Sequence, residues 1–153
     1  LRDSNTSQSV IDIINRLYLE LRPDIFEDLF PLLLGDNGSE FSNPLAIEFD
    51  GQENQRTRVF YCDPSAPYQK GAAENNHELI RRVIPKGTSM DNFTQDDITK
   101  MMNHINCYPR RNLGNKTPYE IFATLYGENL LKKLGISFIS PDEVTLRPSL
   151  LKK

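Results

Sequence analysis

Two short apolar runs limit what this chain can fold into, because each is long enough for one strand and far shorter than the ~20 residues of a membrane span. The first, residues 30–34, is followed at once by Gly-Asp-Asn-Gly at 35–38, and the second, residues 58–62, is closed by Asp-Pro at 63–64. Both closing sequences are turn signals. Strands that are separated by helical segments are typical of a parallel pair. The pattern therefore predicts an α/β fold.

Apolar side chains recur at helical spacing in the first part of the chain. The positions are Val10, Ile13, Ile14, Leu17, Tyr18 and Leu21. They predict a helix over about residues 7–21, which Ser7 or Ser9 caps and Pro23 ends. The sequence Ser-Asn-Pro at 42–44 opens a short helix with proline near its first position.

The second half of the chain is expected to be helical. Apolar residues recur at helical spacing among polar ones over about 69–83 and 94–108, which predicts two helices. A third helix begins with Thr117 as its cap, a proline at the first helical position and Glu120 at the third. The tail from Ile136 has no clear period, and we expect a docked or extended arm.

Length and composition exclude several classes of protein. The 153 residues suit one globular domain, and 38% hydrophobic with 25% charged residues exclude a disordered tail and a membrane protein. No charged segment precedes an apolar stretch, so we expect an intracellular location. A net charge of -3 argues weakly against a dedicated nucleic-acid surface. Cys62 and Cys107 are too few for a disulfide framework or a zinc site.

Asp36 directly follows the first apolar run. The Asn-Gly pair after it is a strong turn signal, so this segment can be a turn and nothing more. Ligand sites in α/β sheets, however, lie at the carboxyl ends of strands, where Asp36 is expected. A plain turn and a functional carboxylate both agree with the sequence.

Glu74 lies early on the helix predicted over 69–83. Glu78 and Arg81 follow at four and seven residues, so three charged side chains share one helix face. Such a stripe is typical of solvated ion pairs. The small residues at 71–73 also allow a nucleic acid or another backbone to approach the start of the helix closely. A functional site is therefore the alternative.

Two segments resemble parts of known catalytic domains. Residues 34–41, Leu-Gly-Asp-Asn-Gly-Ser-Glu-Phe, resemble the second acidic motif of the DDE transposases and retroviral-type integrases. Residues 67–75 resemble the loop and helix start that carry the third carboxylate of those enzymes. Further motifs in the same order and spacing, over about residues 8–126, look most like the insertion-sequence-thirty family of bacterial transposases.

The resemblance implies an RNase H-like fold, the integrase catalytic core, in which three carboxylates hold two divalent metal ions, Mg²⁺ or Mn²⁺. It implies that Asp36 and Glu74 are the second and third catalytic, metal-binding carboxylates, and that Arg81, Lys70 and Asn75 contact DNA. The implied partner is DNA, both as transposon ends and as target. We also expect a homo-oligomer and no association with a membrane. The implied location is the bacterial cytoplasm, where the protein associates with the nucleoid during the reaction.

One part of the family pattern has no counterpart in this sequence. The first carboxylate is expected on the first strand of the fold, well upstream, and Asp3 is the only acidic residue before the first predicted helix. We assign Asp3 no catalytic role. The chain is therefore expected to lack the first strands, to comprise a partial core over 1–126 and a C-terminal extension over 127–153, and to be inactive alone.

The missing strands have a further consequence. They leave the edge of the strand at 30–34 open, which predicts a dimer or a swapped assembly. Two alternatives to a transposase remain. One is a non-catalytic RNase H-like remnant that binds DNA or self-associates, and the other is a nuclease of the same fold that cuts DNA without joining it.

Overall fold

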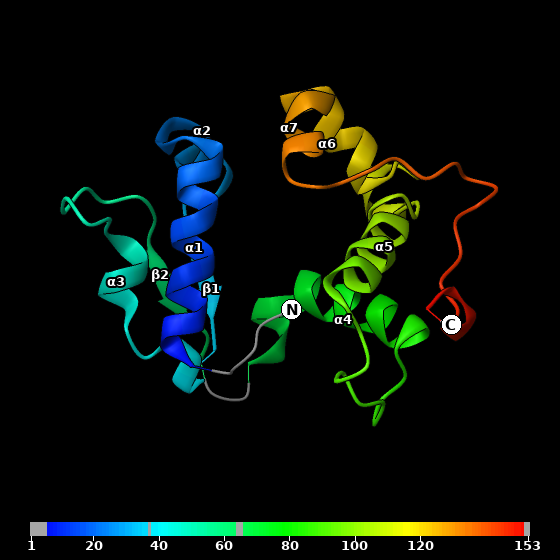
Figure 1. Ribbon diagram of the computed structural model, residues 1–153, viewed down its shortest axis with the longest axis horizontal. Coiled ribbons are helices and arrows are strands. Elements are labelled where there is room, and N and C mark those ends of the chain that lie inside the picture. The colour runs from blue at the N-terminus through cyan, green and yellow to red at the C-terminus, as the bar shows by residue number, and fades with distance from the viewer. Residues whose placement is uncertain (1–5, 37, 64–65, 152–153) are drawn as a thin grey trace. The chain divides into compact units, whose positions relative to one another are not determined.

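The computed structural model describes residues 6–36, 38–63 and 66–151, apart from the side chains of residues 67, 70 and 72 (Figure 1). It is mixed α/β and mostly helical, with a small two-stranded sheet, which confirms the predicted α/β class. The chain divides into two compact units, residues 2–71 and 72–153, and each is described by itself. None of the helices in the described part has the length and hydrophobicity needed to cross a membrane.

The elements follow the chain in the order that Figure 1 shows. The first unit contains α1 (Ser7–Leu21), α2 (Pro23–Leu29), β1 (Leu33–Gly35), α3 (Pro44–Glu48) and β2 (Val59–Tyr61), with 3-10 turns at Ser39–Phe41 and Pro67–Lys70. The second unit contains α4 (Gly71–Val83), α5 (Gln95–Asn106), α6 (Pro118–Tyr126) and α7 (Glu128–Lys133), with 3-10 turns at Arg111–Leu113 and Pro148–Leu150. The boundary between the units coincides with the start of α4.

Helix α1 has the bounds that its apolar period predicts, but its predicted cap was wrong. Thr6 caps the helix, because its side-chain oxygen accepts a hydrogen bond from the backbone N–H of Ser9 at 3.3 Å. Pro23 follows the end of α1 as expected and also opens α2, since proline fits the first position of a helix. Helix α7 has no counterpart among the predicted elements.

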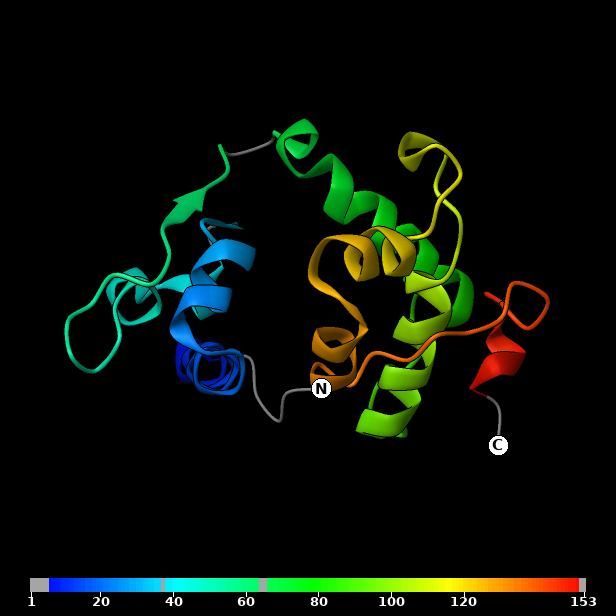
Figure 2. The same ribbon diagram turned by 90° about the horizontal axis from the view of Figure 1, so that it is seen from above.

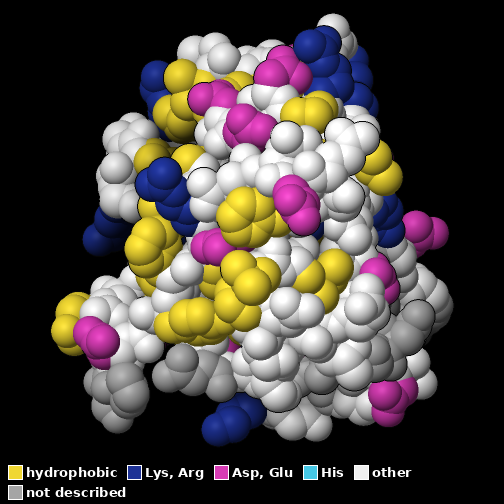
Figure 3. Space-filling model, turned by 90° about the vertical axis from the view of Figure 1, so that its left-hand side faces the viewer, with side chains coloured by type: hydrophobic (Ala, Val, Ile, Leu, Met, Phe, Trp, Pro, Cys, Tyr) yellow, Lys and Arg dark blue, Asp and Glu magenta, His cyan; other side chains and the backbone are white. Residues whose placement is uncertain are grey.

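The two strands pair in parallel, as predicted. Leu33 pairs with Val59, Leu34 with Phe60 and Gly35 with Tyr61. Each strand is three residues long, shorter than its apolar run. Exposed large apolar side chains of the first unit include Leu34 and Phe60, which are 43% and 52% exposed. Figure 3 shows hydrophobic side chains gathered on one face of the molecule.

The core of the first unit forms where α1 packs against α2 and α3. Phe26 of α2 is fully buried, and its ring meets the ring of Tyr18 edge to face, with centroids 5.3 Å apart. Arg56 is also buried and lies over the Tyr18 ring, 5.3 Å from its centroid. An aromatic cluster with one buried cation therefore holds these helices together.

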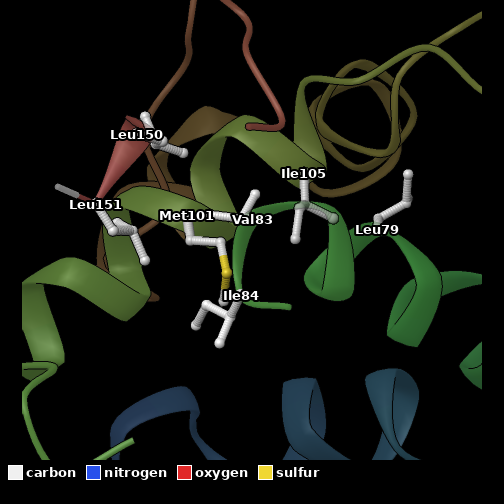
Figure 4. Close-up of a cluster of buried hydrophobic side chains, with 7 residues drawn as sticks. All are labelled: Leu79, Val83, Ile84, Met101, Ile105, Leu150 and Leu151. Carbon is white, nitrogen blue, oxygen red and sulfur yellow. The ribbon is translucent and has the colours of Figure 1, made fainter. Parts of the chain in front are cut away.

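The core of the second unit lies between α4, α5 and the end of the chain. Figure 4 shows its buried side chains, Leu79, Val83, Ile84, Met101, Ile105, Leu150 and Leu151. The tail after α7 carries no helix or strand among its described residues until the 3-10 turn at Pro148–Leu150 (Figures 1 and 2). Burial of Leu150 and Leu151 in this cluster confirms that the tail is a docked arm.

His104 links α5 to the docked arm and makes stability depend on pH. It is 6% exposed, and its Nδ1 accepts a hydrogen bond from the backbone N–H of Thr145 at 3.3 Å. Burial, together with the nearby charge of Lys100, lowers the pKa of His104 below its ordinary value of 6.5, and Glu143 opposes this shift. As the pH falls through 6.5, the unfolded chain therefore binds a proton that the folded chain disfavours.

We expect the free energy of unfolding to fall below pH 6.5 by at most about 1.4 kcal/mol per pH unit from this residue. Urea denaturation at a series of pH values measures the slope. In a His104→Gln variant, the free energy of unfolding is expected to change less with pH over this range. His77, the other histidine, is exposed, so a His77→Gln variant is the matched control and is expected to keep the slope. An unchanged slope in His104→Gln would contradict the prediction.

Candidate functional site

Asp36 lies at the carboxyl end of β1, beside the end of β2. The carboxylate of Asp36 accepts a hydrogen bond from the backbone N–H of Gly38 at 3.3 Å. Gly35 is buried, and a Cβ there would stand 3.3 Å from the ring of Phe41. The Tyr61 hydroxyl donates a hydrogen bond to the backbone oxygen of Phe41. These contacts fold residues 39–41 against the strand ends and leave the side chain of Asp36 exposed.

Glu40 brings a second carboxylate to the same place. A Cβ added to Gly38 would stand 3.0 Å from Asp36 Oδ1 and closer still to Glu40 Oε2. Both carboxylates therefore approach the space beside Gly38. This space has room for them because glycine has no side chain. Glu40 was not among the site residues predicted from the sequence. Its position four residues after Asp36, at the far side of the turn, was the available signal.

Glu74 lies in the first turn of α4, and its side chain is exposed. The segment that leads to this helix is tied by a reciprocal pair. Gln69 Oε1 accepts from the backbone N–H of Asp63 at 2.9 Å, and Gln69 Nε2 donates to Asp63 Oδ2 at 2.9 Å. Glu78 and Arg81 are exposed on α4, as the predicted charged face requires. The side chain of Lys70 lies outside the described residues.

Asp36 and Glu74 belong to different compact units. A shared metal site of these two carboxylates therefore stays a prediction. Within the part of the chain that the structure describes, no group of three or more His, Cys, Asp or Glu side chains is placed to hold a metal ion. The donor chemistry nevertheless fits a hard divalent cation, because Mg²⁺ takes oxygen ligands, often one or two carboxylates together with substrate phosphates. Asp36, with Glu40 close by, supplies such oxygens.

A groove of about 820 Å³ lies in the second unit, along α4 and the segment that joins α5 to α6. Its described lining residues are Asn75, Asn76, Glu78, Leu79, Arg82, Tyr108, Pro109, Arg110, Arg111, Asn112, Leu113, Asn115 and Pro118. Asn75 is therefore in this groove, whereas Arg81 is not among the lining residues and its neighbour Arg82 is. Sequence reasoning missed Arg82 and the pair Arg110-Arg111. Two adjacent basic residues directly after Tyr-Pro, the sequence at which the helix predicted over 94–108 ends, were the signal that pointed to that pair.

Comparisons with known proteins find insertion-sequence transposases. The chain is 32% identical over 103 residues to the transposase for insertion sequence element IS4351 of Bacteroides fragilis, a match that covers 67% of this chain and 30% of the relative. It is 36% identical over 89 residues to the transposase InsI for IS30A of Escherichia coli, covering 58% of this chain and 22% of the relative. The transposase for IS1086 of Cupriavidus metallidurans is 35% identical over 66 residues, covering 43% and 20%.

No family model matches the chain, and no solved structure matches it. The matched segment spans between 20% and 30% of the length of these three relatives. The resemblance to insertion-sequence transposases that the sequence motifs predicted is confirmed by these matches. Over roughly half or more of its length, this chain is a homologue of insertion-sequence transposases, including those of the IS30 family.

Proposed function

We propose that this chain is a catalytic segment of a DNA transposase, which cleaves DNA and joins transposon ends to target DNA with the help of divalent metal ions. The observation that carries the proposal is Asp36, an exposed carboxylate at the carboxyl end of a parallel strand in a transposase homologue. Such strand ends are where α/β folds bind ligands. We further propose that the fold is RNase H-like, with the parallel pair β1 and β2 as part of its sheet.

In this proposal Asp36 and Glu74 hold the metal ions, Mg²⁺ or Mn²⁺. When bound, a pair of such ions activates the attacking oxygen and stabilises the leaving oxygen of an in-line displacement at phosphorus. The carboxylates of this chain would hold the ions in place and offset part of their positive charge. Asp36 directly follows β1, and the first turn of α4 presents Glu74. Both side chains are exposed, so phosphate groups of DNA can reach them.

The test is metal-dependent plasmid cleavage by the intact transposase that contains this segment. Asp36→Asn and Glu74→Gln are each expected to lower the cleavage rate by at least about 100-fold, because several kcal/mol of transition-state stabilisation depend on the metal. Each substitution removes a charge and keeps the shape of the side chain. Removal of the metal with a chelator is expected to have the same effect.

Matched controls use exposed carboxylates at comparable positions. Glu128 lies in the first turn of α7, as Glu74 does in α4, and Asp28 lies on the surface of α2. Glu128→Gln and Asp28→Asn are expected to cleave at the rate of the unaltered enzyme. Cleavage at the control rate by Asp36→Asn and Glu74→Gln would overturn the metal-ligand roles. Analysis of the products separates a transposase, which joins strands, from a nuclease, which only cuts them.

The exposed apolar strand residues favour a second candidate, a segment that self-associates. Leu34 and Phe60 pair in register, so their side chains lie on the same face of the two-stranded sheet. Both are about half exposed. A second copy that covers this face agrees with the homo-oligomer predicted from the open strand edge. Analytical ultracentrifugation of the chain tests self-association. Metal-dependent cleavage by the intact protein separates the two cases, because a non-catalytic remnant would show none.

A further inference from the structure

The groove along α4 carries an excess of positive charge. Arg82, Arg110 and Arg111 line it, and Glu78 is the one carboxylate among its described lining residues. The ion pairs found in the described part of the chain join Arg16 to Glu20 and Arg22 to Asp24, all in the first unit. The groove arginines take part in none of these pairs. The chain as a whole is acidic, with a net charge of -3, so this is a local concentration of charge.

Arg110 is held in the groove by neutral groups. Its Nη2 donates to the side-chain oxygen of Asn76 on α4 at 3.0 Å and to the backbone oxygen of Ile105 at 3.4 Å. Burial lowers the pKa of Arg110, although an arginine in a protein keeps its proton. Among the described residues, this partly desolvated cation therefore forms no ion pair. An anion that enters the groove gains more from such a cation than from one in water.

The segment after Arg110 is preformed. Residues 110–116 close on themselves through backbone hydrogen bonds, from Arg110 N–H to the Lys116 oxygen at 3.0 Å and from Asn115 N–H to the Arg110 oxygen at 2.9 Å. Gly114 and Asn115 both have left-handed backbone angles, with φ of 64° and 63°. Glycine and asparagine are the residues that adopt this conformation most readily. Arg111 therefore sits on a rigid turn, which lowers the entropy lost when it binds a ligand.

We propose that this groove binds the phosphate backbone of duplex DNA, with Arg82 and Arg111 as contact residues and Arg110 as a positioning residue. This inference rests on the proposed function, because DNA is the polyanion that such an enzyme handles. Guanidinium groups pair well with phosphate oxygens. The asparagine side chains along the groove, Asn75, Asn112 and Asn115 among them, add donors for phosphate and sugar oxygens, which position a protein on DNA without reading its sequence.

The occupant is duplex rather than single-stranded DNA, as the aromatic content of the groove indicates. Proteins that bind single strands combine a basic groove with several aromatic side chains on which bases stack. Tyr108 is the one aromatic residue among the described lining residues, and it is partly buried. The groove therefore offers charge and polar donors for a backbone, with little surface for exposed bases.

The test is fluorescence anisotropy of the 153-residue chain with a labelled duplex of random sequence, between about 50 mM and about 200 mM salt. Arg82→Gln and Arg111→Gln are each expected to weaken binding about two- to fivefold. The slope of log K against log salt is expected to fall by about 0.9 for each phosphate contact that is lost. Arg147→Gln removes the same charge from an exposed site elsewhere in the second unit and is expected to bind as the unaltered chain does.

Arg110→Gln is left as a secondary variant, because it also breaks the bond to Asn76 and can alter the fold. Thermal melting by circular dichroism confirms that the other variants are folded. Equal affinity and equal slope in the double variant Arg82→Gln/Arg111→Gln would overturn the inference, as would an equal loss in Arg147→Gln or tighter binding of a single-stranded probe of the same length. Plasmid cleavage by the intact enzyme reports separately on Asp36 and Glu74, so failure of the groove leaves the proposed function standing.

Discussion

Phe26→Ala is expected to lower the free energy of unfolding of the first unit by about 3–5 kcal/mol. The Phe26 side chain is 0% exposed, so its removal opens a cavity that the surrounding helices fill only in part. It also contacts two further rings. The Tyr18 ring lies edge-on with centroids 5.3 Å apart, and the Phe30 ring is tilted with centroids 5.0 Å apart. These aromatic contacts add to the loss from burial alone.

Chemical denaturation of the whole chain, followed by circular dichroism, measures this change. Hydrogen exchange assigns it to the first unit, where the amides of α1 and α2 are expected to lose protection. Leu19→Ala is the matched control, because Leu19 lies on α1 and is 82% exposed. We expect that control to stay within about 0.5 kcal/mol of the unaltered chain. A similar loss in both variants would mean that Phe26 is not the centre of this core.

Arg56→Met is expected to cost about 3 kcal/mol, the second largest effect, because Arg56 is a buried hydrogen-bond donor. Its side chain is 2% exposed, and Nε and Nη2 donate to the backbone oxygens of Ile47 and Ala46, both at 2.9 Å. Those oxygens lie in α3, whose carbonyl end favours a cation. Methionine fills much of the same space and leaves both oxygens without that donor.

Two further variants separate hydrogen bonding from charge. Arg56→Lys keeps the charge and loses the two-pronged geometry of the guanidinium, so we expect an intermediate loss. Arg58→Met changes an exposed arginine two residues later in the chain and is expected to be nearly neutral. Chemical denaturation of the three variants ranks them. If Arg56→Met were as stable as Arg58→Met, the hydrogen bonds of the guanidinium would do no more than offset the free-energy cost of burying it.

Several elements could be predicted from the sequence because their causes are local. The apolar period predicted α1 with the bounds that the structure has, and the Thr-Pro-x-Glu pattern at 117–120 predicted the start of α6. Thr117 and Glu120 form the reciprocal capping box there, with Glu120 accepting from the Thr117 backbone N–H at 2.7 Å. Spacing along one segment determines both features, so no distant residue is needed to predict them.

Helix α7 and the cap of α1 were missed for a different physical reason. Helix α7 is six residues long, too short to show a period, and Leu131 is 2% exposed because it packs beside Tyr119 and Cys107. Its stability comes from that packing rather than from its own sequence. At α1, the hydroxyl groups of Thr6, Ser7 and Ser9 could each serve as the cap, and backbone geometry selects Thr6.

The sequence by itself determined the α/β class, the parallel strand pair, the position of Asp36 at a strand end and the likeness to transposases. Each depends on residues that lie close together along the chain or on motifs in order. Only the tertiary structure decided that Arg56 is buried on α3, that Glu40 approaches Asp36, and that Arg82 rather than Arg81 shares a groove with Arg111. Those contacts depend on how the chain turns and packs between distant segments, because packing decides which donors meet which acceptors.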